Sequence, residues 1–252
     1  LGLKLHWLED ETSIKLSDLP EDTQNRLREG IPQKSLENAA DAVDNYREQI
    51  DESKAKAGTV NAVVQEVPDL DAALQYVVDV CAAKSPCELL ADEPGTQRGP
   101  NGPNGVPTRV QRIVAAPCLD EEHFARLSAA CEAKGFLCLK DGLRGRLAGI
   151  DVGFSMADFG VAASATCVVN TDSEEGRLAG MISEVSVIAL KKSEIYPHLP
   201  AIAGKMRERM GTGSTPTYTT FITGPSRTAD IERVSAIGVH GPLELHIVLL
   251  EA

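Results

Sequence analysis

Several features that would reveal a function at once are missing from this sequence of 252 residues. Aromatic side chains make up only 4% of it, and no run of about 18 apolar residues could span a membrane. The first residues also lack the basic segment and apolar run of a signal peptide. We therefore expect a cytoplasmic protein without a membrane span.

Positive charge is scarce as well. Lys and Arg number 25 against 37 Asp and Glu, which gives a net charge of -12. Because such a field repels phosphate backbones and anionic lipids, the composition disfavours binding to nucleic acid or to a membrane surface. The 42% of hydrophobic residues is nevertheless ordinary for a globular protein with a buried core.

The cysteines lack the spacing of a metal site. They are Cys81, Cys87, Cys118, Cys131, Cys138 and Cys167. No two of them form the C-x-x-C pattern that binds zinc or an iron–sulfur cluster, so we predict no metal site and no cluster in this chain. Cys131, Cys138 and Cys167 lie in apolar patterns and are predicted to pack in the core. Cys81 and Cys87 are expected to be reduced.

Residues 1–57 are predicted to form a helical arm, and residues 58–252 an α/β domain. The arm contains two helical patterns, Ser17–Glu29 and Ser35 to about Ala57, each followed by a glycine. The second carries a narrow apolar seam, formed by Leu36, Ala40, Val43, Tyr46 and Ile50. This seam suits packing either on a neighbouring surface of the chain or on a second copy in a homodimer.

From residue 59 onward, apolar runs alternate with amphipathic helices. The predicted strands are Thr59–Val67, Glu88–Ala91, Val110–Ala115, Phe136–Leu139, Ile150–Phe154, Ala165–Asn170 and Val185–Leu190, and the predicted helices are Asp69–Lys84, Asp120–Lys134 and Leu199–Met210. Residues 92–109 contain four Gly and four Pro and are predicted to be a surface loop. The alternation indicates a mainly parallel mixed sheet flanked by helices. The last three of these strands have short connections, so we expect some antiparallel pairing.

The segment after residue 217 reads as strand, loop, helix, loop and strand. The strand Tyr218–Thr223 ends in Gly224-Pro225-Ser226, and Ser226 or Thr228 could cap the helix expected next. Amide groups at a helix start attract anions, and Arg227 could bind a carboxylate or phosphate in bidentate fashion. Asp230 could cap the same helix or pair with Arg227.

The second loop, residues 238–242, places His240 between two glycines just before the last strand. Histidine is the side chain best suited to exchange protons near neutral pH. The alternative is that Gly238 ends the helix, Gly241-Pro242 form a turn, and His240 is a hydrogen-bonded strut.

Three segments together resemble a known family. They are GIDVGFSMADFGVAASATCVV at 149–169, ITGPSRTADIE at 222–232 and GVHGPLELHIVLL at 238–250. They are similar to the lactate-utilisation (LUD) domain proteins, particularly the lactate-utilisation protein C, or YkgG-like, branch. The resemblance implies an α/β fold similar to the NagB/RpiA/CoA transferase-like fold. It also implies a cytoplasmic role in oxidising L-lactate to pyruvate beside iron–sulfur partner subunits, which would hold the clusters.

We expect one ligand pocket where both loops meet at the carboxyl ends of the strands. The predicted binding residues are Gly224, Ser226, Arg227, Thr228 and Asp230, and the predicted catalytic residues are His240 and Asp158. Asp158 is placed in a Met-Ala-Asp turn, where it could alternatively serve only as a turn cap. The expected ligand is a small carboxylate or a nucleotide-like molecule.

Two segments depart from the family pattern. Residues 163–166 read Ala-Ser-Ala-Thr instead of Glu/Asp-Thr-Gly-Thr, and residues 183–186 read Ser-Glu-Val-Ser instead of Pro-x-x-His. These changes imply a different ligand, weaker binding or a scaffold role. A non-catalytic assembly or regulatory protein therefore stays an alternative, as does an independent enzyme similar to CoA transferases or cyclo-ligases.

Overall fold

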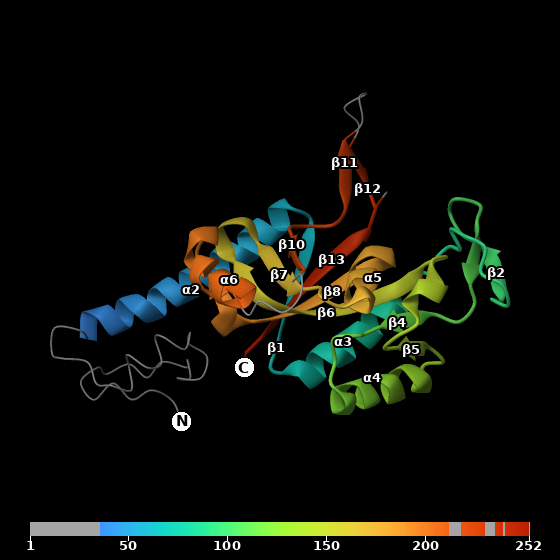
Figure 1. Ribbon diagram of the computed structural model, residues 1–252, viewed down its shortest axis with the longest axis horizontal. Helices are drawn as coiled ribbons and strands as arrows, with labels where there is room; N and C mark the ends of the chain where they lie inside the picture. The colour runs from blue at the N-terminus through green and yellow to red at the C-terminus, as the bar shows by residue number, and fades with distance from the viewer. Residues whose placement is uncertain (1–35, 212–217, 230–234, 239, 252) are drawn as a thin grey trace.

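The computed structural model describes residues 36–211, 218–229, 235–238 and 240–251 (Figure 1). The predicted helix Ser17–Glu29 and the candidate residue Asp230 lie outside these ranges. Within them, no helix has the length and apolar character needed to cross a bilayer.

The described helices and strands alternate along the chain as the pattern predicts. The helices are α2 (Leu36–Thr59), α3 (Leu70–Ala83), α4 (Glu121–Ala133), α5 (Glu174–Ile182) and α6 (Ala203–Gly211), with short 3₁₀ helices η3 (Leu143–Arg146), η4 (Ala162–Ser164), η5 (Lys192–Glu194) and η6 (Leu199–Ile202). The strands are β1 (Ala62–Val67), β2 (Arg98–Asn101), β3 (Pro107–Arg109), β4 (Ile113–Ala115), β5 (Leu137–Leu139), β6 (Ile150–Val161), β7 (Thr166–Asn170), β8 (Ser183–Lys191), β9 (Ile195–Tyr196), β10 (Thr219–Ile222), β11 (Arg227–Ala229), β12 (Ser235–Ile237) and β13 (Glu244–Leu250).

A large mixed sheet forms the centre of the molecule. Its main path runs in the order β1-β13-β8-β6-β4-β5, and every neighbouring pair along this path is parallel. The second half of β6 leaves this path and pairs antiparallel with β7, which pairs antiparallel with β10. The predicted α/β class, with a mostly parallel sheet and some antiparallel pairing, is confirmed.

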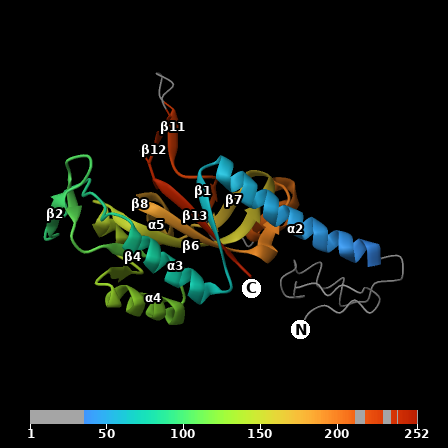
Figure 2. The same cartoon turned by 180° about the vertical axis from the view of Figure 1, so that it is seen from behind.

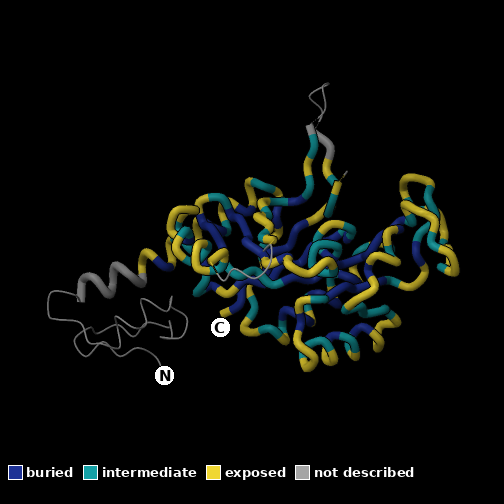
Figure 3. The backbone as a smooth tube through the Cα atoms, in the orientation of Figure 1, coloured by how far each residue is buried: buried dark blue, intermediate teal, exposed yellow. Residues whose placement is uncertain are grey.

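Helices cover both faces of this sheet. Helices α3 and α4 pack on one face, where Leu74, Val77 and Leu127 meet Val152 and Phe154 of β6. Helices α2 and α5 lie on the opposite face, as both ribbon views show (Figures 1 and 2). The buried residues form a continuous band through the sheet in Figure 3.

Capping residues explain why α3 and α4 begin where the sequence predicts. The Asp69 carboxylate accepts a hydrogen bond from the Ala72 amide at 2.8 Å, and the Asp120 carboxylate accepts one from the His123 amide at 2.9 Å. Gly135 follows α4 with a φ of 75°, a left-handed angle that glycine adopts without strain.

The C-terminal part of α2 packs on the domain itself. Tyr46, Ile50 and Ala57 are buried in one cluster with Ala162 of η4 and Ile195 of β9. The sequence analysis left two partners for the apolar seam, the same chain or a second copy. This part of α2 packs on its own chain. The first residues of the seam, at positions 36, 40 and 43, have side chains outside the described set.

Two predictions about residues 88–109 are wrong. Glu88–Ala91 is not a strand, since only Glu88 forms a bridge, to Thr108. The expected loop contains a hairpin instead, because β2 and β3 pair antiparallel. The Glu88 carboxylate anchors its turn by accepting hydrogen bonds from the backbone and side-chain amides of Asn104, at 2.9 and 2.8 Å. Glycine and proline therefore mark a tight hairpin here rather than an irregular loop.

The turn predicted around Asp158 is wrong, because this residue belongs to strand β6. This strand runs unbroken from Ile150 to Val161, so Asp158 lies within a strand and not in a turn. Its pairing with β7 shifts register between Ala157 and Phe159, which makes Asp158 the extra residue of a β-bulge.

Between β7 and β8, the short connection holds α5, a helix that the sequence analysis did not predict.

The helix predicted after Ser226 is also wrong where the chain is described. Residues 227–229 and 235–237 form β11 and β12, which pair antiparallel as a hairpin that projects from the body (Figure 1). Gly224 and Gly238, with φ of 77° and 80°, stand where the chain enters and leaves this hairpin. Glycine and serine before a new element suit a turn into a hairpin as well as a helix cap.

Candidate functional site

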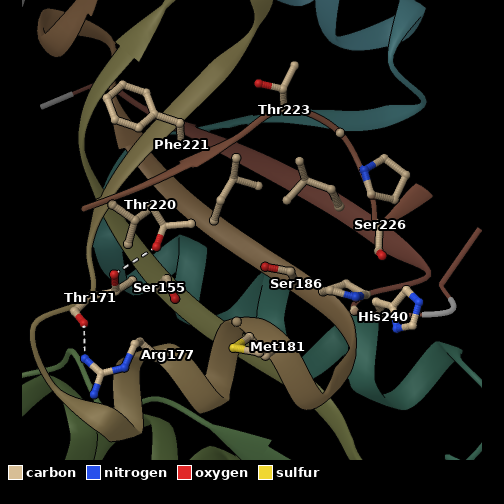
Figure 4. A pocket seen from close by; sticks show the side chains of 18 of the residues that line it. Ser155, Thr171, Arg177, Met181, Ser186, Thr220, Phe221, Thr223, Ser226 and His240 are labelled. Carbon is tan, nitrogen blue, oxygen red and sulfur yellow. Dashed lines mark hydrogen bonds between the residues drawn. The ribbon is translucent and has the colours of Figure 1, made fainter. Parts of the chain in front are cut away.

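A cavity of about 320 Å³ brings the two predicted loops together. Gly224 and Ser226 follow β10, while His240 and Gly241 precede β13, and all four line this cavity. The predicted convergence of the loops is therefore present. The cavity lies at the amino ends of the parallel strands β8 and β13, however, and not at their carboxyl ends. Helix α5 and strand β10 supply its other walls (Figure 4).

Two serine hydroxyls form the polar part of the cavity floor. Ser155 of β6 is 8% exposed and Ser186 of β8 is 3% exposed, and both line the cavity. Neither hydroxyl has a hydrogen-bond partner among the described residues, in contrast to Thr171, whose hydroxyl lies 2.8 Å from that of Thr220. Figure 4 shows both serines between the sheet and α5. Because both hydroxyls face the cavity and lack a protein partner, they are free to hydrogen-bond a polar ligand.

The charged groups at the cavity are few. Among the described lining residues there is no carboxylate, and Arg177 of α5 is the one with a guanidinium group. Its Nη1 atom donates to the carbonyl oxygens of Thr171 and Asp172 at 2.7 and 2.9 Å. The group also lies 4.7 Å from the centre of the Tyr218 ring, and Figure 4 shows it turned toward Thr171 and away from the two serines. The centre of the cavity is therefore largely uncharged.

Other predicted site residues lie elsewhere. Arg227 is exposed and donates from Nη2 to the Val60 carbonyl at 2.9 Å, and neither it nor Thr228 lines the cavity. Asp158 pairs with Arg209 of α6 and also lies outside the lining. Of the predicted set, the structure brings together Gly224, Ser226 and His240.

Of the two departures from the family pattern, the one at residues 183–186 reaches the cavity directly, and the one at residues 163–166 lies beside its wall. Ser186 occupies the floor at the position where the pattern has histidine. Thr166 lies 2.6 Å, hydroxyl to hydroxyl, from Thr223, which lines the cavity, and 2.7 Å from Ser164. Ser186 therefore puts a small hydroxyl where the pattern has an imidazole, and Ala163 puts a methyl group where the pattern has an acid, while Ser164 and Thr166 keep the hydroxyls of the pattern.

Sequence reasoning missed the contribution of α5. Its residues Gly176, Arg177, Gly180 and Met181 line the cavity, and they recur at helical spacing on one face. The available signal was Ser173, which caps this helix by accepting a hydrogen bond from the Gly176 amide at 3.0 Å. Two glycines inside a short helix weaken the helical pattern, so the sequence alone does not predict this helix.

A second cavity of about 410 Å³ adjoins the first and shares Met181, His240 and Gly241 with it. Cys87 and Glu184 line this second cavity. His240 therefore has access to both spaces.

Behind the second cavity lies a buried ion network. The fully buried Asp151 carboxylate accepts hydrogen bonds from the amides of Cys87 and Ile113 at 2.8 and 2.9 Å and from Lys84 Nζ at 3.1 Å. Lys84 also pairs with Glu184 at 2.7 Å. Burial alone would lower the pKa of Lys84, but the two carboxylates raise it overall. Burial, followed by the Asp151 charge, raises the pKa of the Cys87 thiol to about 12, so Cys87 is a poor nucleophile near neutral pH.

The cysteines are free, and Cys81, Cys87, Cys131 and Cys167 are buried. Core packing is thereby confirmed for Cys131 and Cys167, while Cys138 is partly exposed. In the described part of the chain, no three His, Cys, Asp or Glu side chains gather closely enough to hold a metal ion.

The fold and the cavity define an α/β protein whose ligand-sized cavity lies at the amino ends of parallel strands. The chain belongs to the LUD domain family, whose sequence profile matches residues 50–250. The resemblance of the three segments is thereby confirmed.

Individual relatives match a smaller part of the chain. It is 35% identical to the uncharacterized protein YkgG of Escherichia coli over 101 residues, which is 40% of this chain and 44% of that protein. It is 31% identical to the lactate utilization protein C of Shouchella clausii over 101 residues, with the same coverage of 40% and 44%. The chain thus spans less than half the length of the curated relatives it matches. A solved structure of a DUF162 family protein from Deinococcus radiodurans is similar at a TM-score of 0.49 and 12% identity, covering 81% of this chain and 98% of that one.

Proposed function

We propose that this protein is a cytoplasmic subunit of a system that oxidises L-lactate to pyruvate, in which it provides a ligand-binding cavity. The support is membership of the LUD domain family together with relatives named lactate utilization protein C. The observation that carries the role is the cavity between the loops at 224–226 and 240–242, which has the unpaired hydroxyls of two buried serine residues on its floor.

The proposed reaction needs an electron acceptor and a proton acceptor, which different subunits would supply. Oxidising lactate to pyruvate removes two electrons and two protons from the substrate. This chain lacks the C-x-x-C spacing of cluster-binding proteins, so iron–sulfur partner subunits would accept the electrons. His240, which lines the cavity, would accept a proton from a bound ligand or donate one to it. The ligand would be the small carboxylate or nucleotide-like molecule that the sequence predicts.

The test is lactate-dependent dye reduction under anaerobic conditions, with the two iron–sulfur partner proteins and with or without this chain. We expect reduction to require the chain and to fall at least tenfold with His240→Ala. The matched control is His198→Ala, which changes an exposed histidine away from the cavity. If activity needs the chain but tolerates His240→Ala, the chain is a scaffold. If the chain makes no difference, the lactate assignment is wrong.

A further inference from the structure

We propose that the cavity beside α5 binds an uncharged flat ring that carries carbonyl groups at its edge, as quinones and flavin-type rings do. This inference rests on the proposed function, in that it takes this cavity as the ligand site of the lactate system. It goes further by choosing between the two ligand classes that the sequence leaves open, a small carboxylate and a nucleotide-like molecule.

The floor of the cavity supplies hydrogen-bond donors without charge. Ser155 and Ser186 are each more than nine-tenths buried as residues, and their hydroxyls line the cavity without a hydrogen-bond partner among the described residues. They come from neighbouring strands, since Gly153 of β6 pairs with Ser186 of β8. A ligand with two carbonyl groups on one edge could accept hydrogen bonds from both hydroxyls. The arrangement therefore favours a polar edge directed at the floor.

The charge of the cavity disfavours a carboxylate at this floor. An anion buried there would lose its hydration, and a cation close by would be needed to compensate. Arg177 is turned toward the carbonyl oxygens of Thr171 and Asp172 and away from the serines. Arg227 does not line the cavity at all. A neutral ring avoids the cost of burying a charge.

The shape of the cavity favours a flat molecule. Gly180 of α5 leaves the helix wall open, whereas the space beside Gly176 is taken up by Ser173 Oγ, 3.0 Å from where a Cβ atom would lie. A Cβ atom on Gly180 would meet nothing within 4 Å, because open space lies beside it. The surrounding walls are apolar, formed by Val169, Ile222 and Leu245. A ring could therefore lie against the helix backbone while apolar side chains cover its edges and opposite face.

The size agrees with this ligand class. A volume of about 320 Å³ lies at the lower end of small-molecule sites, which span about 300–1,000 Å³. A three-carbon acid would leave most of that space to water. A ring of one to three fused units fills it better.

The test uses lumichrome as the flavin-type probe and duroquinone as the quinone probe, with the complete chain. Lumichrome binding is followed by its fluorescence, and duroquinone, L-lactate and pyruvate are added as competitors. We expect saturable one-to-one binding of lumichrome, which duroquinone displaces and which neither L-lactate nor pyruvate displaces. If duroquinone binds more tightly than lumichrome, the site takes a quinone-type ring. If lumichrome binds more tightly, the site takes a flavin-type ring.

Three variants locate the binding. Ser186→Ala should weaken ring binding about fivefold, the effect of losing one hydrogen bond. Gly180→Leu should weaken it more than tenfold by filling the space beside α5. Gly204→Leu is the matched control, because Gly204 lies in α6, is exposed and also has open space around it. Circular dichroism verifies that each variant is folded, and the smaller Gly180→Ala replaces Gly180→Leu if the latter is not.

Failure of this inference differs from failure of the proposed function. If neither ring binds, or if binding is unchanged in both Ser186→Ala and the folded Gly180 variant, the ring assignment is overturned even when dye reduction still requires the chain. If a ring binds as expected but dye reduction ignores the chain, the ligand class stands and the lactate role falls.

Discussion

Two groups of polar side chains lie near the amino ends of parallel strands, and they differ in how completely they are paired. Around Asp151 of β6, every strong donor and acceptor is matched, and the carboxylate alone receives four hydrogen bonds. A short distance away, Ser155 and Ser186 are almost as deeply buried, yet no described residue pairs with either hydroxyl. The comparison teaches that burial alone does not assign a role. A closed network, in which the polar groups are paired with one another, holds the fold together. An open one, whose groups lack protein partners, is available to a ligand.

The largest effect should come from breaking the closed network. We expect Asp151→Ala to lower the free energy of unfolding by about 3–5 kcal/mol, because the amides of Cys87 and Ile113 lose their acceptor and Lys84 loses one of its two ion-pair partners. Urea unfolding at pH 7 measures this loss. The exposed Asp79→Ala in α3 is the control and should change stability by less than about 0.5 kcal/mol. A loss below about 1 kcal/mol for Asp151→Ala would contradict a stabilising role for the network.

A second buried ion cluster, around Glu93, should also stabilise the fold, and its contribution should depend on pH. Hydrogen bonds, first from Arg109 and then from Arg146, hold the pKa of Glu93 at about 2 despite burial. Since an unfolded glutamate titrates near 4.3, the charged form stabilises the fold above that pH, and this contribution disappears as the pH falls toward 2.

We therefore expect Glu93→Gln to cost about 2–3 kcal/mol at pH 7. The difference in unfolding free energy between Glu93→Gln and the wild type should narrow steadily between pH 4.5 and pH 2.5. Urea midpoints at several pH values measure both effects, with the exposed Glu48→Gln of α2 as the control. A gap that stays constant over this range would mean that charge pairing at Glu93 does not contribute.

The smallest effects distinguish two serines of the same strand. Ser183 is 2% exposed and its hydroxyl donates to the Ala179 carbonyl at 2.7 Å, whereas Ser186 is 3% exposed and has no described partner. Ser183→Ala should cost about 1 kcal/mol of stability, while Ser186→Ala should change it by less than about 0.5 kcal/mol. Thermal unfolding of the two variants side by side gives the comparison. Equal losses would show that Ser186 is paired in solution and would weaken its assignment to a ligand site.

Local patterns predicted much of the fold. Asp69 and Asp120 mark helix starts because a capping carboxylate acts on amides only three residues away, so the cause lies inside the sequence window. The alternation of apolar runs with amphipathic helices likewise predicted the parallel sheet. The same local reasoning failed after Gly224, because a glycine and a serine can precede a helix or a hairpin. Pairing of β11 with β12 decides between them.

The candidate site was predictable only in part, for a related reason. The loops around Gly224 and His240 could be found because glycine and histidine between strands are conspicuous in the sequence. Ser155 and Ser186 carry no such signal, since their lack of partners depends on the packing of α5 and β10 above them. The pairing of Asp158 with Arg209 also joins residues far apart in the chain, and no local pattern predicts it.

The position of β13 in the sheet has a consequence for how the protein folds during its synthesis. This strand is the last one described along the chain, yet it lies between β1 and β8, with Leu245 paired to Ala62 on one side and to Ser186 on the other. During synthesis, β1 and β8 leave the ribosome long before the strand that joins them. Each then presents an unpaired edge, which is a template for misassociation with other chains. Closure of the sheet must therefore wait for residues 244–250, the strand that pairs with both edges.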